Sequence, residues 1–314
     1  MLKRRRLYFT LFALIMGMGA FIRFKAEPDE VTISIVGDIM LSRGVQKYLD
    51  EYGYDYPYGD VRQWFLKDDL TIANLECPIT ENENAANKAR RFLFRADREN
   101  AASLKQAGFD CINLANNHSM DYMSAGLHDT MKYLDDSGLA YVEASENASL
   151  KQPYIFEKNG IRVGVLAYSA LPPEGFFFHE EKPTVQYIST MDFSGLEEDI
   201  AAVQCDFLIV YFHWGIEYQR YKSDMQERIA KKAIDLGADF VVGAHPHVLQ
   251  EPEIYKDRYI YYSLGNFVFD KQIPPGTDET MILQITVGRQ GLTGVEEIPL
   301  VIREGKPVSG LQGT

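Results

Sequence analysis

The sequence predicts a layered α/β sandwich in which helices cover two stacked β-sheets. Short segments rich in β-branched and apolar residues alternate with amphipathic segments early in the chain, and strand-like segments dominate later. The chain has 314 residues, of which 46% are hydrophobic, and this is enough to bury one large core. We therefore expect one main domain, residues 31–314.

Turn and capping residues mark the limits of these segments. The predicted strands are apolar runs at residues 31–36, 70–75, 110–115, 155–156, 161–167, 206–212, 239–243, 258–262, 281–287 and 295–302. Asn159-Gly160 favours a tight hairpin between two of them, because both residues tolerate a positive φ. Ser124 is the expected N-cap of one helix, and Gly108 is expected to end another. The predicted helices cover residues 42–49, 97–107, 124–136, 192–203 and 223–236.

Residues 1–30 are expected to be separate from this domain, as a cytoplasmic basic tip, a membrane anchor or signal peptide, and a linker. Basic residues at positions 3–6 precede an uncharged apolar run, and residues 7–24 are the predicted membrane contact. Basic residues before such a run keep the N-terminus in the cytoplasm, which places the body outside the cell membrane on a single span. The body would be secreted if cleavage occurred near the small residues Gly19-Ala20.

The balance of charge excludes nucleic acid as a partner. The formal net charge is −13, and every charged residue among the first 25 is basic, so the predicted domain is more acidic still. A surface of this sign repels the phosphate backbone, whose binding needs clustered lysine and arginine.

Side chains that bind metals or transfer protons stand at the ends of separate predicted strands. Five apolar runs are each followed by such residues, namely Asp38, Glu76, Asn117 with His118, His213, and His245 with His247. In layered α/β proteins, sites form beyond the carboxyl ends of the strands, so we expect these side chains at one rim. Carboxylates, an amide and imidazoles suit Mn, Fe or Zn, and one carboxylate between two ions would help them to activate water.

Taken singly, most of these residues also have an ordinary structural use. These uses are a helix cap, a solvated turn residue, an Asx-turn and a buried hydrogen-bonded histidine, for Asp38, Glu76, Asn117 and His213 respectively. His245 and His247 are harder to explain in this way, because alternate residues of an extended backbone point in the same direction. The repetition of such residues at separate strand ends favours one joint metal site.

Six ordered motifs in the chain resemble the CapA family of poly-γ-glutamate capsule synthesis and export proteins. The motifs are GDIMLSR at 37–43, NLECPIT at 74–80, NLANNHSMD at 113–121, FHWGIEY at 212–218, GAHPHVLQ at 243–250 and SLGNF at 263–267. The resemblance spans about residues 31–287. That family is in turn similar to calcineurin-like metallophosphoesterases, which implies a four-layer αββα sandwich that holds one or two divalent metal ions.

The resemblance also implies roles for individual residues. His118 would be the catalytic proton donor to a leaving group. Two positions depart from the metallophosphoesterase pattern: Met40 stands where a histidine ligand is usual, and Ser119 where an acidic residue orients the catalytic histidine. Asp121 is expected to take over that orienting role. The implied ligands are Glu76, Asn117, His213 and His245 for one ion, and Asp38, Glu76 and His247 for the other.

Three further residues are predicted to act around these ligands. Arg43 is expected to hold a carboxylate or phosphate of the substrate by a bidentate contact. Asn266 is expected to contact the substrate, and Glu217 to orient His213.

A basic island stands out in this acidic chain. Arg90, Arg91 and Arg95 could contact an anionic polymer or a partner chain. Phe92 and Phe94, however, favour a strand whose alternate faces separate the arginines.

These features predict a metal-dependent hydrolase outside the cell, which acts on an anionic polymer or a small ester. A hydroxide that bridges the two ions would attack the substrate, and His118 would protonate the leaving group. Two other functions stay open. One is a non-catalytic scaffold that works with membrane synthase subunits to guide poly-γ-glutamate, which the loss of a histidine at Met40 favours. The other is a stand-alone secreted phosphatase.

Overall fold

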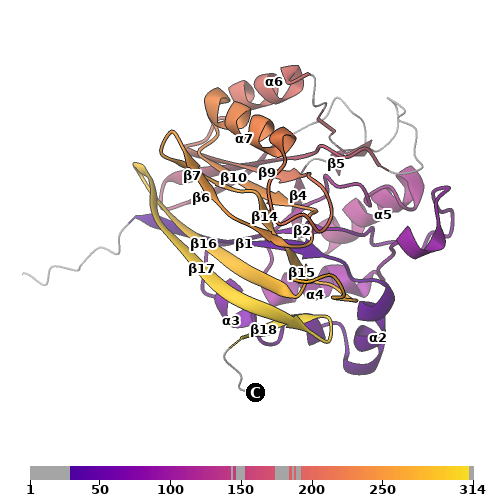
Figure 1. Ribbon diagram of the computed structural model, residues 1–314. Helices are drawn as coiled ribbons and strands as arrows, with labels where there is room; N and C mark the ends of the chain where they lie inside the picture. The colour runs from indigo at the N-terminus through magenta and orange to yellow at the C-terminus, as the bar shows by residue number, and fades with distance from the viewer. Residues whose placement is uncertain are drawn as a thin grey trace, which may run out of the picture.

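Two β-sheets lie face to face, with helices on both outer sides (Figure 1). The computed structural model describes residues 29–142, 144–145, 153–173, 184–185, 187–188 and 192–310. The first sheet runs in the order β18 (Lys306–Ser309), β17 (Gly291–Arg303), β16 (Glu279–Gly288), β1 (Glu30–Ile39), β2 (Leu70–Leu75), β3 (Cys111–Asn113) and β4 (Ala140–Val142), and β15 (Asn266–Val268) also pairs with β1.

The second sheet contains the later parallel strands. Its order is β12 (Glu253–Tyr255), β13 (Arg258–Tyr261), β10 (Phe240–Ala244), β9 (Phe207–His213), β7 (Ile161–Ser169) and β6 (Tyr154–Lys158). Two short pairs lie outside the main sheets, β11 (Leu249–Gln250) with β14 (Ser263–Leu264), and β5 (Ala144–Ser145) with β8 (Thr184–Val185). The helices are α2 (Arg43–Tyr52), α3 (Arg62–Phe65), α4 (Glu99–Ala107), α5 (Met123–Asp136), α6 (Ser194–Ala202) and α7 (Asp224–Leu236), with 3₁₀ turns η1 (Tyr56–Tyr58) and η2 (Arg90–Phe92).

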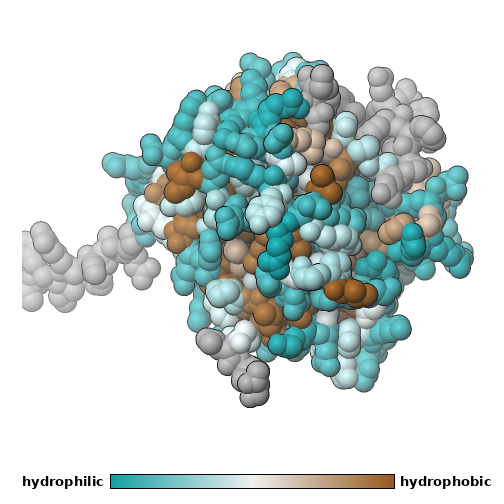
Figure 2. Space-filling model, in the orientation of Figure 1, coloured by the Kyte–Doolittle hydropathy of each residue, from teal (hydrophilic) through white to brown (hydrophobic). Residues whose placement is uncertain are grey.

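Buried hydrophobic side chains fill three interfaces between these layers. Leu104 of α4 and Leu134 of α5 pack on the outer side of the first sheet. Ile33 of β1 and Ile209 of β9 belong to the core between the two sheets, and Ile229 of α7 packs on the outer side of the second sheet. The face shown in Figure 2 is mostly hydrophilic, as expected when the apolar side chains are inside. The predicted α/β sandwich is therefore confirmed, with four layers.

Most predicted elements are present with shifted ends, but the expected end of one strand and the expected cap of one helix are wrong. β3 stops at Asn113, before the predicted end at residue 115, because the Asn113 side chain accepts the N–H of Ala115 (2.7 Å). α5 begins at Met123, so Ser124 lies in its first turn and is not the N-cap. The predicted hairpin turn is confirmed, since Asn159-Gly160 joins β6 to β7 with both φ angles positive.

The predicted membrane anchor falls outside the described residues. Residues 7–24 and the basic tip before them belong to the segment 1–28, whose structure is not described. Within the described ranges, the helices are too short or too polar to cross a bilayer.

Parallel pairing aligns the strand ends that carry the predicted site. Asp38 pairs with Asn74 across β1 and β2, and His213 at the end of β9 is in register with the last residue of β10. Gly37 makes this possible at β1, since a Cβ there would lie 1.9 Å from the carbonyl oxygen of Gly265. With no side chain in the way, the N–H of Asp38 donates to that carbonyl at 3.0 Å.

Candidate metal centre

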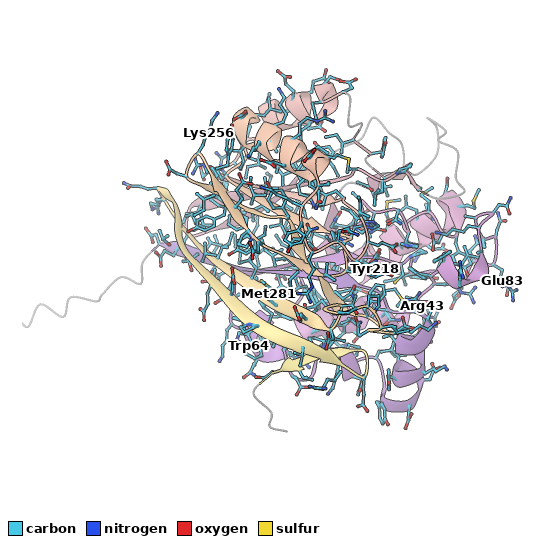
Figure 3. The ribbon with its side chains drawn as sticks, viewed as in Figure 1. Arg43, Trp64, Glu83, Tyr218, Lys256 and Met281 are labelled. Atoms are coloured by element: carbon cyan, nitrogen blue, oxygen red, sulfur yellow. The ribbon has the colours of Figure 1, made fainter. Side chains whose placement is uncertain are left out.

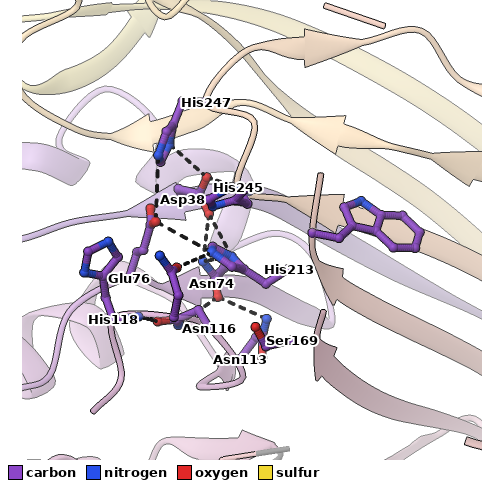
Figure 4. A network of polar contacts seen from close by, with 12 residues as sticks. Asp38, Asn74, Glu76, Asn113, Asn116, His118, Ser169, His213, His245 and His247 are labelled. Carbon is purple, nitrogen blue, oxygen red and sulfur yellow. Dashed lines mark hydrogen bonds and ion pairs between the residues drawn. The ribbon is translucent and has the colours of Figure 1, made fainter. Parts of the chain in front are cut away.

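The side chains predicted as metal ligands converge at one end of the two sheets (Figure 4). They come from the ends of β1, β2, β9 and β10 and from the turn after β3. All are at most 6% exposed: Asp38, Glu76, Asn117, His213, His245 and His247. Packing of the two sheets thus brings together residues that are far apart in the chain.

Two groups of three side chains have the spacing of a metal site, since their ligand atoms all lie within 4.8 Å of one another. Asn117 adjoins the first group, with its Oδ1 2.8 Å from Nε2 of His213. Glu76 belongs to both groups, so its carboxylate stands between them. The first group is Glu76, His213 and His245, and the second is Asp38, Glu76 and His247.

The surroundings of Glu76 suit a cation. Both of its carboxylate oxygens are buried and accept no hydrogen bond from the described residues. Burial, followed by the negative charge of Asp38, raises the pKa of Glu76 well above its ordinary value, so the ionised form is costly without a positive partner. Nδ1 of His245 is also buried without a hydrogen bond from any described residue. Oxygen and imidazole donors left unsatisfied in one buried space fit a divalent ion.

The three imidazoles differ in their pKa values. Burial, followed by the neighbouring histidines, lowers the pKa of His213 and His245 well below the usual value, which favours the neutral form that binds metals. Burial alone would also lower the pKa of His247. The charge of Glu76, with the hydrogen bond and charge of Asp38, instead raises the His247 pKa to about 9. His247 therefore carries a proton at neutral pH, which an ion would have to displace.

The sequence pattern favoured an extended backbone at His245 and His247. The backbone there is instead bent. His245 has φ 94° and His247 has φ 58°, both in the region that favours glycine. Such conformations cost about 1–3 kcal/mol each. Asp38 supports this bend, because its carboxylate accepts the N–H of His245 at 3.1 Å. The bend sends the two imidazoles into different ligand groups, with ring centroids 5.7 Å apart.

Asn74, for which no role was predicted, holds two of the ligand side chains through its amide. Its Nδ2 donates to Oδ1 of Asp38 at 2.7 Å and lies 3.3 Å from Nδ1 of His213. Its Oδ1 accepts from the amides of Asn113 (3.0 Å) and Asn116 (3.2 Å). The sequence did contain a signal for this role. Asn74 lies inside the predicted apolar strand 70–75, and an amide buried in such a strand needs polar partners.

His118 lies beside the metal ligands in a fixed setting. Its Nδ1 is 3.1 Å from Oδ2 of Asp121, so the expected orienting residue is within hydrogen-bond distance. Asp121 also accepts the N–H of Phe94 at 2.8 Å, and the Phe94 ring stacks on the imidazole with centroids 4.1 Å apart. Lys88 lies 2.5 Å from Oδ1 of Asp121 and 3.3 Å from His118 Nδ1. Nothing in the spacing of Lys88 along the chain could have pointed to this contact.

Arg43 lies between an aspartate and two phenyl rings. Its guanidinium forms an ion pair with Asp270 at 2.5 Å, and Asp270 also accepts the N–H of Gly44 at 2.9 Å. The guanidinium carbon is 4.5 Å from the centre of the Phe94 ring and 5.4 Å from that of Phe269. Arg43 also has a positive φ of 52°, a strained conformation for this residue. Asp270 was not expected from the sequence, and it fixes where this cation lies.

The contacts of Asn266 and Glu217 differ from those expected. Asn266 is buried, and its Oδ1 lies 2.9 Å from Nδ1 of His247, so it is placed to orient that ring. The direct substrate contact expected of Asn266 stays a prediction. Glu217 is exposed, whereas both nitrogens of His213 face other residues, so the prediction that Glu217 orients His213 is wrong for the described structure. Met40 packs into the core between the first sheet and its helices.

The structural uses considered for Asp38 and Asn117 do not apply. Helix α2 has Ser42 at its N-cap, and Asp38 bonds to Asn74 and to the backbone of His245. The Asx-type bond after β3 comes from the neighbouring Asn116, whose Oδ1 accepts the N–H of His118 at 3.1 Å.

Comparison with known proteins agrees with the motifs. Residues 32–271 match the family described as bacterial capsule synthesis protein PGA_cap. The chain is 34% identical to the capsule biosynthesis protein CapA of Bacillus anthracis, over 90% of this chain and 70% of that protein. It is 33% identical to the PGA biosynthesis protein CapA of Bacillus subtilis, over 89% of this chain and 73% of that protein.

The fold also resembles that of a solved phosphatase from Mycoplasma pneumoniae. The TM-score is 0.57 at 15% sequence identity, and the match covers 88% of this chain and 95% of that one. At this identity the likeness concerns the fold alone. The family match, by contrast, spans every strand end that carries a predicted ligand.

Proposed function

This chain belongs to the family of bacterial capsule synthesis proteins, and we propose that it is a metal-dependent hydrolase in the synthesis or export of poly-γ-glutamate. The observation that carries the proposal is the Glu76 carboxylate, which is buried without a hydrogen bond from described residues between two groups that contain histidine. Relatives named for capsule and PGA biosynthesis support the polymer context. The fold shared with a phosphatase is compatible with hydrolysis, and the two ligand groups are what favour it.

The converging side chains would hold two divalent ions, with Glu76 between them. When bound, such ions lower the pKa of water and offset the negative charge of an oxyanion. Asn74 and Asn266 would keep the ligands in place, since each bonds to a ligand side chain. The proposed ligands are Asn117, His213 and His245 for one ion, Asp38 and His247 for the other, and Glu76 for both.

His118 would protonate the leaving group from a fixed orientation. Asp121 bonds to its Nδ1, and the Phe94 ring packs against its face. Lys88 and the N–H of Phe94 in turn hold the Asp121 carboxylate. We assign the transferred proton to Nε2, because the bond at Nδ1 sets the ring as in other histidine–carboxylate pairs.

Arg43 would bind an anionic group of the substrate beside the ions. Asp270 and two phenyl rings hold its guanidinium, yet 24% of the side chain stays exposed. One of these rings, Phe269, also packs on His247 with centroids 4.9 Å apart, so the guanidinium adjoins the ligands. A planar guanidinium held in this way suits a carboxylate or a phosphate.

We also propose that residues 7–24 anchor the chain in the cell membrane, with the body outside. The basic residues before the apolar run support this orientation. Membrane synthase subunits would then be neighbours of the body. Digestion of the body by protease added to intact protoplasts is the expected result, and complete protection would contradict it.

Metal content and activity measured on the same protein test the enzyme. The purified full chain is supplied with Mn, Fe or Zn, and hydrolysis of phosphoesters and of γ-glutamyl chains is followed. We expect two ions per chain, and a loss of hydrolysis by about 100-fold or more in His118→Asn with metal content unchanged, since a general acid contributes at least that much.

His128→Asn is the matched control, because this histidine is exposed on α5 and belongs to neither ligand group. Bound metal without hydrolysis of either substrate would favour the scaffold function. Hydrolysis of phosphoesters alone, with capsule formation unaffected by deletion of the protein, would favour a separate phosphatase. A wild-type chain that binds no metal would refute the proposal.

A further inference from the structure

A cavity that is lined by two arginines lies outside the metal centre. Its volume is about 440 Å³. None of the proposed metal ligands contributes to its wall, which consists of Glu83, Ala85, Arg90, Leu93, Arg95 and Tyr122. Glu83 and Arg43 lie on the same side of the molecule in the view of Figure 3.

The local backbone explains why Arg90 and Arg95 share this cavity. The strand expected here would have separated the arginines, but residues Arg90–Phe92 form a 3₁₀ turn. The turn directs Arg91 elsewhere, and its guanidinium lies over the exposed Phe92 ring at 4.7 Å. The strand prediction is therefore wrong, and the turn places Arg90 instead of Arg91 in one wall with Arg95.

The charges of the wall favour an anion. Two guanidinium groups face one carboxylate, that of Glu83, so the cavity is positive in a chain whose net charge is −13. Arg95 donates to the carbonyl of Asn82 at 3.1 Å and lies over the Tyr122 ring at 5.3 Å. The guanidinium of Arg90 makes no hydrogen bond or ion pair with the residues that the structure describes. A guanidinium of this kind can take a carboxylate with two parallel hydrogen bonds.

The cavity and the metal centre are neighbours across one extended strip. Leu93 and Arg95 line the cavity, whereas Phe94 between them contacts His118 and Arg43. Such alternation is usual in extended chain. The N–H of Arg95 also donates to Oγ of Ser42 at 3.1 Å, next to Arg43. The cavity wall and the contacts of His118 and Arg43 therefore meet at the same strip of chain.

We propose that this cavity is a second anion subsite, which binds one carboxylate of an extended polyanion while another part of the same chain occupies the metal centre. A small ester could fill only the metal centre. A γ-linked glutamate chain fits both, because every residue carries a free carboxylate. The identification of the polyanion as γ-linked glutamate rests on the proposed function, but the cavity itself does not depend on bound metal.

The test measures binding of a labelled γ-linked glutamate decamer to the purified full chain by fluorescence anisotropy. Arg90→Ala should weaken binding about tenfold, as expected for one charge-assisted contact. Arg91→Ala is the matched control, since it removes the same charge from the same turn outside the cavity, and it should change binding less than twofold. Glu83→Gln should strengthen binding, because it removes the opposing charge.

Two further measurements separate this proposal from the proposed function. Inorganic phosphate should bind equally to the wild type and to Arg90→Ala, and the metal content of Arg90→Ala should be unchanged. His245→Ala should bind less metal yet keep the dependence of decamer binding on Arg90. Equal weakening by Arg90→Ala and Arg91→Ala would overturn the subsite. So would an equal loss of phosphate binding, since the cavity would then be a site for small free anions.

Discussion

The two sheets supply chemically different halves of the metal centre. The strands of the first sheet lead to oxygen ligands, and those of the second lead to imidazole nitrogens. Each ligand group draws on both sheets, so neither sheet could hold an ion alone. The oxygen half is Asp38, Glu76 and Asn117, and the nitrogen half is His213, His245 and His247.

Because the two halves lie on different sheets, metal binding would be linked to folding. The oxygen half brings two carboxylates close together in a buried space, whereas in the nitrogen half His213 and His245 are kept neutral and only the raised pKa of His247 favours a compensating charge. An ion that contacts both halves would offset this repulsion and would stabilise the packing of the sheets. A direct bond from the hydroxyl of Tyr211 to the carbonyl of Val36 (2.7 Å) also joins the sheets near this end.

Replacement of Glu76 should have the largest effect on the metal centre, because this residue serves both ligand groups. Glu76→Gln is expected to abolish binding of both ions, whereas His245→Ala and His247→Ala should each remove one. Elemental analysis of the purified chain measures this. Glu251→Gln is a control, since Glu251 is exposed. Retention of one ion in Glu76→Gln would show that the two groups do not share this ligand.

Replacement of Asn74 should have the next largest effect, because its amide contacts both halves. Asn74→Ala is expected to weaken metal binding about 10–100-fold. It should also lower the free energy of unfolding by about 1–3 kcal/mol, because buried partners lose their bonds. Metal titration and thermal unfolding of the metal-free chain check the two effects, with the exposed Asn84→Ala as control. Reduced stability with unchanged metal affinity would make Asn74 purely structural.

The pH dependence of metal affinity should also differ between the two ions, and this is the smallest of the expected effects. The pKa of His247 is raised to about 9, so the ion at Asp38 and His247 must displace a proton at any lower pH. Its affinity should therefore rise up to about tenfold per pH unit between pH 7 and 9. His213 and His245 have lowered pKa values and release no proton there, so the first ion should lack this contribution.

Calorimetric titration of metal into the metal-free chain at pH 7, 8 and 9 measures this difference. The shared Glu76 affects both ions alike, so the contrast between them reports His247. Parallel pH profiles for the two ions would contradict the assignment of His247 to the second ion.

Much of the fold and of the metal centre could be predicted from the sequence alone. The strand segments, the hairpin at Asn159-Gly160 and the ligands at the strand ends follow from hydrophobic patterning and turn residues, which act over a few positions. Parallel pairing within the first sheet also predicts that Asp38 and Glu76 end at one edge, whereas His213 joins them only because the second sheet packs against the first. The resemblance to metallophosphoesterases added the division of ligands into two groups.

Long-range packing determined the other contacts around the site. Arg43 meets Asp270 across 227 positions, and Lys88 reaches Asp121 from an irregular segment, so no local pattern marks either pair. The left-handed bend separates the two closing histidines, and the turn at Arg90 unites two arginines that a strand would have split. Such contacts depend on where loops come to lie once the two sheets have packed, and periodicity within a segment carries no information about that.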